Sequence, residues 1–71
     1  MNRSKLRGLV YSRFKTIGDF SNAIGWQRNK ASRIINGPQE PDSEDMRRIA
    51  ELFNLSSEDF VDIFFEKQFT K

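Results

Sequence analysis

The chain has 71 residues and a net charge of +2, and it contains neither cysteine nor histidine. This length allows a single domain, and the two missing residue types supply the commonest metal ligand, general base and thiolate nucleophile, so we expect no enzyme, metal site, cofactor or small-molecule ligand. Because no apolar run exceeds three residues, the chain cannot span a membrane, and we expect a cytoplasmic protein.

The first predicted helix extends from about Ser4 to Phe14. Its apolar residues recur at the spacing of one helical face, which indicates an amphipathic helix packed on a core. They are Leu6, Leu9, Val10 and Phe14, and Ile17 continues the series.

Residues 16–37 (TIGDFSNAIGWQRNKASRIING) predict two short helices joined at Gly25. Thr16 is the expected N-cap of the first, with Asp19 complementing its amide end. This helix is predicted to end at Ile24, because Gly25 supplies a left-handed stop. We expect its inner face to consist of Phe20, Ala23 and Ile24.

The second of these helices is predicted over residues 27–36, and Gly37-Pro38 ends it. Its inner face is expected to consist of Ala31, Ile34 and Ile35. Its polar face carries Arg28, Asn29, Lys30, Ser32 and Arg33. A helix this short, polar and basic beside a glycine turn is what a helix-turn-helix, here about residues 16–36, requires to enter the major groove of DNA.

Two further helices are predicted after the loop at residues 37–41. Asp42 is the expected cap of the fourth helix, whose apolar face consists of Met46, Ile49, Ala50 and Phe53. Ser56, with Asp59 three residues later, starts the fifth, whose inner face consists of Phe60, Ile63 and Phe64. Because no strand pattern occurs, we predict an all-α fold, a compact five-helix bundle with a helix-turn-helix, as one domain over residues 1–71.

The fifth helix carries a second apolar stripe made of Val61, Phe65 and Phe69. Two explanations remain open: the helix is buried on two sides, or the stripe is a two-fold dimer contact. A single short helix reads only a few base pairs, so specific occupancy usually requires two copies on adjacent half-sites. This requirement favours a homodimer, at least on DNA.

Charge is distributed unevenly along the chain. Residues 1–36 contain eight basic residues and one acidic residue, a net charge of +7, whereas residues 37–71 contain four basic and nine acidic residues, a net charge of −5. Such an asymmetry is typical of a protein with one face built for a polyanion, and it favours association with the nucleoid. We expect Arg3, Lys5 and Arg7 to be mainly solvated rather than to contact DNA.

The hexapeptide at residues 32–37 (SRIING) resembles S-R-I-E-N-G, which ends the recognition helix in the Cro/repressor (XRE) family of helix-turn-helix proteins. The resemblance covers roughly residues 6–60 and implies a lambda repressor-like DNA-binding domain. It is supported by Gly25, Pro41, Ile49-Ala50 and Leu55-Ser56. The short length and the phenylalanine-rich end also resemble single-domain Cro-like regulators of phages and mobile elements.

The chain departs from the family pattern at four positions. Ile17 stands where the family has a glutamine that holds the DNA backbone, which calls one phosphate contact into question. Ser21 replaces an alanine, and Ile35 replaces a glutamate. Trp26 replaces a small residue after the turn glycine, and we expect it to fill the core between the second and third helices rather than to stack on a base or sugar.

The first turn of a recognition helix points at base edges, so Arg28 and Asn29 are the main candidates for direct readout. Arginine can pair with guanine and asparagine with adenine, each with about 1–3 kcal/mol of discrimination. Further readout candidates are Ser32 and Arg33. The expected contacts with the DNA backbone come from Arg13, Lys15, Thr16, Gln27, Lys30 and Asn36, and the family resemblance implies those of Gln27 and Asn36.

These observations predict sequence-specific binding of double-stranded DNA in the major groove, by a transcriptional repressor that acts at operators near its own gene. The alternative is a helix-turn-helix scaffold used as a protein-interaction adaptor for another regulator or an antitoxin-type partner. The hypotheses differ in the residues that matter. DNA binding depends on Arg28, Asn29 and Arg33, whereas an adaptor depends on Phe65 and Phe69.

Overall fold

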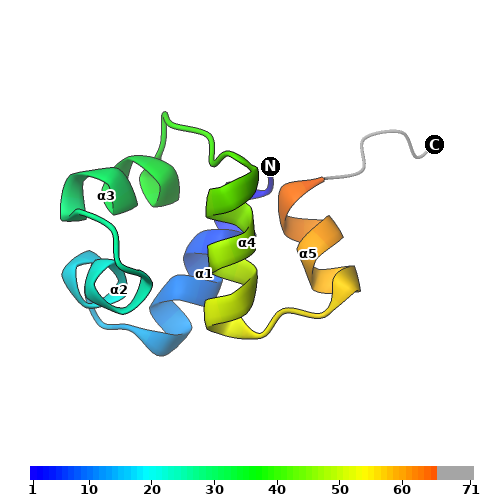
Figure 1. The fold of residues 1–71 in the computed structure, drawn as a ribbon, viewed down its shortest axis with the longest axis horizontal. Helices are drawn as coiled ribbons and strands as arrows, with labels where there is room; N and C mark the ends of the chain where they lie inside the picture. Colours follow the sequence, from blue (N-terminus) through cyan, green and yellow to red (C-terminus); the bar gives the residue numbers. More distant parts are fainter. Residues whose placement is uncertain (66–71) are drawn as a thin grey trace.

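The computed structural model describes residues 1–65 of the chain. Over these residues the chain forms five helices and no strand, namely α1 (Arg3–Arg13), α2 (Ile17–Ile24), α3 (Arg28–Asn36), α4 (Ser43–Phe53) and α5 (Ser57–Phe64). In Figure 1, α2 and α3 lie at one end of the molecule and α5 lies at the other, with α1 and α4 between them. The predicted all-helical fold is confirmed for the described residues. None of their helices has the length and apolar character needed to cross a membrane.

Side-chain caps start four of the five helices. The hydroxyl of Thr16 accepts the amide of Asp19 at 3.1 Å, and the hydroxyl of Ser56 accepts the amide of Asp59 at 3.1 Å, as predicted. Asp42 forms a reciprocal capping box at the start of α4. Each cap satisfies an amide that has no carbonyl partner in the first turn, which explains why these local signals set the helix starts.

The core is formed by one face of each helix. Its buried apolar residues are Leu6, Val10, Phe20, Ile24, Ala31, Ile34, Ile35, Ile49, Phe53, Ile63 and Phe64. Ala23, which we expected on the inner face of α2, is exposed, and Ser21 is buried instead. The face of α2 that turns inward carries Ile17, Phe20 and Ile24. Ser21 lies beside these residues on the helix, whereas Ala23 lies farther round. The Ser21 hydroxyl is satisfied there, because it donates to the Gly18 carbonyl at 2.8 Å.

Trp26, in the turn between α2 and α3, packs against this core as predicted. Its ring meets that of Phe20 edge-on, with the ring centroids 5.8 Å apart. An edge-to-face pair of this kind is a favoured aromatic geometry. The indole therefore helps to hold the start of α3 against α2.

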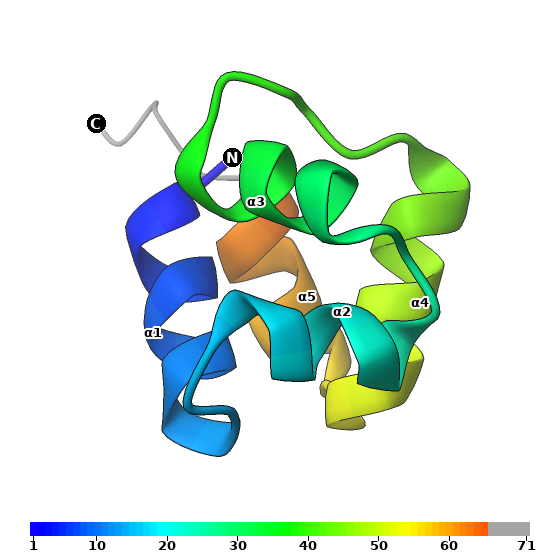
Figure 2. The same cartoon turned by 90° about the vertical axis from the view of Figure 1, so that its left-hand side faces the viewer.

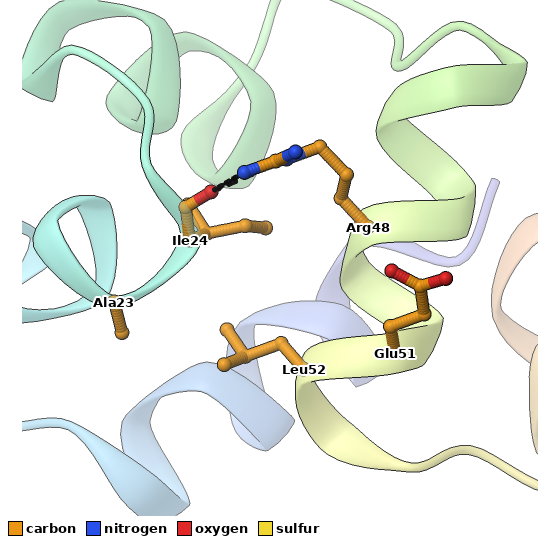
Figure 3. A pocket seen from close by; sticks show the side chains of 5 residues that line it. All are labelled: Ala23, Ile24, Arg48, Glu51 and Leu52. Carbon is orange, nitrogen blue, oxygen red and sulfur yellow. Dashed lines mark hydrogen bonds between the residues drawn. The ribbon is translucent and has the colours of Figure 1, made fainter.

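Arg48 of α4 connects that helix to the carboxyl end of α2. Its Nη2 donates to the Ile24 carbonyl at 2.6 Å, across an open hollow of about 250 Å³ that is also bordered by Leu52 (Figure 3). The adjacent Gly25 has φ +83°, and a Cβ added there would lie 2.9 Å from Arg48 Nη2. Glycine is favoured at this turn for its left-handed backbone conformation, and a Cβ there would also require the end of the Arg48 side chain to shift.

Candidate functional site

α2 and α3 form one end of the molecule. They pack against each other and are joined by residues 25–27, and α3 also packs on α1 while α2 packs on α4. Figure 2 shows both helices nearest the viewer, with α5 behind them. The outward side of α3 therefore faces solvent at the opposite end of the molecule from α5.

The exposed face of α3 gathers the predicted base-reading residues. Arg28, Asn29 and Arg33 are exposed, and Ser32 is half-buried on the same side of the helix. α3 contains no acidic residue, so no carboxylate of its own neutralises this face. The structure brings together polar side chains that donate and accept hydrogen bonds, on a surface with a positive charge.

The amino end of α3 is the one helix start among residues 1–65 without a side-chain cap. Gln27 occupies the capping position, but its side chain makes no capping hydrogen bond. The first helical hydrogen bond of α3 runs from the amide of Ala31 to the carbonyl of Gln27. The amides of residues 28–30 therefore have no intrahelical acceptor, and they add a partial positive charge.

Arg28 extends from α3 to the start of α2. Its Nε and the hydroxyl oxygen of Thr16 both lie within 4 Å of the position that a Cβ on Gly18 would occupy. Lys15, which precedes Thr16, is also exposed. The amino ends of α2 and α3 thus lie next to each other, and they carry Lys15 and Arg28 together with the exposed Asp19.

Two arginines of residues 1–36 donate hydrogen bonds to backbone carbonyls near the carboxyl ends of helices. Arg13 donates to the Leu52 carbonyl in the last turn of α4 at 3.2 Å, and its guanidinium lies 5.2 Å from the centre of the Phe53 ring. Arg3 donates to the Ile34 carbonyl in α3 at 3.1 Å and to the Gln39 carbonyl at 2.9 Å. We expected Arg3 to be solvated, and this was wrong, because the last carbonyls of a helix lack intrahelical donors and a nearby guanidinium supplies them.

Lys30 is held by groups of this protein. Its Nζ lies 2.9 Å from Oδ1 of Asp45 and 4.9 Å from the centre of the Trp26 ring. The Asp45 side chain is 6% exposed and the Lys30 side chain 34%. The predicted contact of Lys30 with a phosphate would compete with this ion pair.

Most basic side chains among residues 1–65 have a hydrogen-bond or ion-pair partner within those residues. Within residues 1–65, the side chains of Arg7, Lys15 and Arg28 make no hydrogen bond or ion pair. Arg33 donates through Nε to Oε1 of Gln39 at 3.0 Å, which leaves both terminal nitrogens for another acceptor. Two of these four cations, Arg28 and Arg33, belong to the exposed face of α3.

The α4–α5 end has a different surface. An open groove of about 470 Å³ runs between the two helices, with an apolar lining of Met46, Ala50, Leu55, Phe60, Val61 and Phe65. Val61 is 38% exposed and Phe65 is 56% exposed, so part of the predicted second stripe is open to solvent. Phe69, the third member of that stripe, lies outside the described residues.

Comparison of the chain with models of protein families, with characterised proteins and with solved structures found no match. Within residues 1–65, no cluster of three or more acidic side chains has the arrangement of a metal site.

Proposed function

We propose that α2, the turn at residues 25–27 and α3 form a helix-turn-helix that binds double-stranded DNA in a sequence-specific manner, with α3 in the major groove. The observation that carries this proposal is the exposed face of α3, which presents Arg28, Asn29, Ser32 and Arg33 without any acidic residue. A polyanion requires such a face, and base edges require its mixture of donors and acceptors.

Base readout is assigned to the first turn and the middle of α3. Arg28 pairs with the O6 and N7 acceptors of a guanine, and Asn29 pairs with the N6 and N7 atoms of an adenine. Arg33 presents its two free nitrogens one turn further on, beside Ser32. Three or four side chains of this kind are what a recognition helix places against base edges.

Backbone contacts come from the edges of the same surface. Lys15 and Thr16 lie at the start of α2, Gln27 and the open amides at the start of α3, and Asn36 at the end of α3, all exposed. Helix amino ends with open amides bind phosphate well. Arg13 and Lys30 already have partners within the protein, so we expect fewer phosphate contacts than the count of basic residues indicates.

The protein acts on DNA as a homodimer that represses transcription near its own gene. Repression requires only that the operator is occupied. Two copies related by a two-fold axis would place two recognition helices on half-sites about 34 Å apart. The α4–α5 groove, with its exposed Val61 and Phe65, supplies an apolar surface for the second copy.

The same groove supports a second candidate function, an adaptor that binds another protein. The exposed apolar side chains favour it, because a small monomer rarely leaves such a surface in water. In that case the exposed face of α3 would be dispensable. The two candidate functions therefore differ in which end of the molecule binds the partner.

Selection of duplexes from a random-sequence library, followed by fluorescence anisotropy at two salt concentrations, tests the proposal. We expect enrichment of a two-fold symmetric motif, tight binding that survives scrambled competitor, and affinity that falls as salt rises. The Arg28→Ala variant is expected to lose the enrichment at one position of each half-site. Failure of the parent protein to enrich any motif would overturn sequence-specific DNA binding and leave the adaptor.

A further inference from the structure

α3 is held to the rest of the protein unevenly. Its buried residues Ala31, Ile34 and Ile35 belong to the core, and the helix packs closely on α1 and α2 but not on α4. Apolar packing on one side resists separation of helices more than it resists a small rotation of one about its own axis. Polar contacts of defined geometry are therefore suited to fix that rotation; Arg3 of α1 makes one at the carboxyl end of α3, and a second lies on the α4 side.

Lys30 makes such a contact with α4. Its Nζ lies 2.9 Å from Oδ1 of Asp45, a residue in the first turn of α4. The ion pair joins residues 15 positions apart across the gap between α3 and α4. A partly buried lysine in this position is restrained more than an exposed one, because its partner is almost fully shielded from water.

Asp45 is itself fixed by the capping box of α4. Its Oδ2 accepts the amide of Asp42 at 3.2 Å, and its own amide donates to Oδ1 of Asp42 at 2.8 Å. The carboxylate cannot follow a movement of Lys30 without loss of the cap. Asp45 is thus a rigid anchor for α3.

Trp26 restrains Lys30 from the other side. The ammonium lies 4.9 Å from the centre of the indole ring, within the range of a cation–π contact. The indole is in turn held by its edge-to-face contact with Phe20. The ammonium of Lys30 is therefore located between the turn before α3 and the start of α4.

We propose that Lys30 is a positioning residue of the recognition surface, which sets the rotation of α3 through Asp45, and not a ligand of a DNA phosphate. This inference rests on the proposed function, because the residues that it positions are Arg28, Asn29 and Arg33. Paired hydrogen bonds to a base edge tolerate little displacement, whereas flexible cations adapt to a phosphate. Loss of the ion pair should therefore reduce discrimination between DNA sequences more than it reduces non-specific affinity.

The experiment compares Lys30→Met, Lys30→Arg, Asp45→Asn and the Lys30→Met/Asp45→Asn double variant with the parent protein. Binding to the selected duplex and to a scrambled duplex is measured at several salt concentrations, at a temperature where circular dichroism shows every variant to be folded. We expect Lys30→Met to lower the ratio of specific to non-specific affinity by about tenfold, with the same salt dependence as the parent. Asp45→Asn should reproduce this loss, the double variant should add little to it, and Lys30→Arg should restore the ratio.

Lys15→Met is the matched control, since Lys15 is exposed and has no partner within residues 1–65. It should weaken binding to both duplexes equally and reduce the slope of log K against log salt by about 0.9, the change for one lost phosphate contact. The same behaviour in Lys30→Met, with an unchanged specificity ratio, would overturn the proposal and make Lys30 a phosphate ligand.

Amide hydrogen exchange in α3 tests the ion pair without DNA. Lys30→Met and Asp45→Asn should accelerate exchange in α3 to a similar extent, and the double variant should exchange no faster than either. Parent-like exchange in Lys30→Met would show that the ion pair does not restrain α3. If Lys30→Met and Asp45→Asn accelerate exchange in α3 but the parent protein selects no DNA motif, the proposed function fails while the restraint by the ion pair stands.

Discussion

The α2–α3 end and the α4–α5 end of this molecule both carry charged residues, yet they use them differently. On the exposed face of α3, Arg28 has no partner within residues 1–65 and Arg33 keeps two free nitrogens. On α4, Arg47 forms ion pairs with both Glu44 and Glu51. The hydrogen bond and charge of Glu44, with a further contribution from Glu51, raise the pKa of Arg47 above its ordinary value. The two ends therefore differ in how available their cationic groups are to another molecule.

The apolar residues show the opposite distribution. Those of α3 are buried in the core, whereas Val61 of α5 and Phe65, which follows α5, are exposed beside a groove. Among residues 1–65, one end thus exposes polar groups without a protein partner and the other exposes apolar side chains. The first suits a charged and hydrogen-bonding partner, and the second suits another protein surface.

The largest expected effect is on the turn that holds the α2–α3 end together. Gly25→Ala forces a side chain into a left-handed conformation and places its Cβ 2.9 Å from Arg48 Nη2. We expect the free energy of unfolding to fall by about 2–3 kcal/mol, as measured by urea denaturation. Gly8→Ala is the control, because Gly8 lies within α1 with nothing near its Cβ position, and it should raise stability by about 0.5–1 kcal/mol. Equal stability of the two variants would contradict the role of the turn.

The next effect concerns readout by α3. Arg28→Ala should reduce discrimination at one base pair by about 1–3 kcal/mol while leaving the free energy of unfolding nearly unchanged, because the side chain is exposed and has no partner among residues 1–65. Anisotropy with duplexes substituted at single positions measures the discrimination. If Arg28→Ala and the parent discriminate equally at every position, Arg28 does not read a base.

At the opposite end, Phe65→Asp should give a folded protein whose self-association is weakened by about tenfold or more, since a charge replaces a large exposed apolar side chain at the proposed contact. Sedimentation equilibrium measures the association, and operator binding should weaken in parallel. Asp62→Asn, one turn away on α5, offers a control with little expected change. A parent protein that remains monomeric at high concentration would exclude the groove as a dimer contact.

The smallest expected effects are changes in the free energy of unfolding when either of two adjacent arginines of α4 is replaced. Arg48→Met removes a donor to the Ile24 carbonyl and should lower the free energy of unfolding by about 1–2 kcal/mol. Arg47→Met removes only exposed ion pairs and should change it by less than about 0.5 kcal/mol. Thermal unfolding of the two variants provides the comparison, and a reversed order would contradict the capping role of Arg48.

Much of the fold was predictable because its signals are local. Thr16, Asp42 and Ser56 each contact an amide three residues later, so the sequence alone locates three helix starts. The inner face of α3 was also correct, since three β-branched or small residues at helical spacing leave one choice of face. The inner face of α2 was partly wrong, because spacing alone did not distinguish Ala23 from Ser21 at the margin of the buried stripe.

The candidate site was less predictable. The sequence located Arg28, Asn29 and Arg33 on the polar side of a short helix, and the structure places them on an exposed face. It did not indicate that Lys30 is bound by Asp45 or that the Nε of Arg33 is bound by Gln39. A long cationic side chain can reach several partners, and which of them is in range depends on how the helices pack.

The sequence by itself determined the helices and their caps, because these depend on groups within about four residues of each other. It also determined the excess of positive charge in residues 1–36. Only the tertiary structure decided which of those charges stay available. Arg3, Arg13 and Lys30 donate to acceptors that lie between 15 and 39 residues away in the chain. Those acceptors are helix-end carbonyls and one buried carboxylate, whose positions exist only after the helices have packed together.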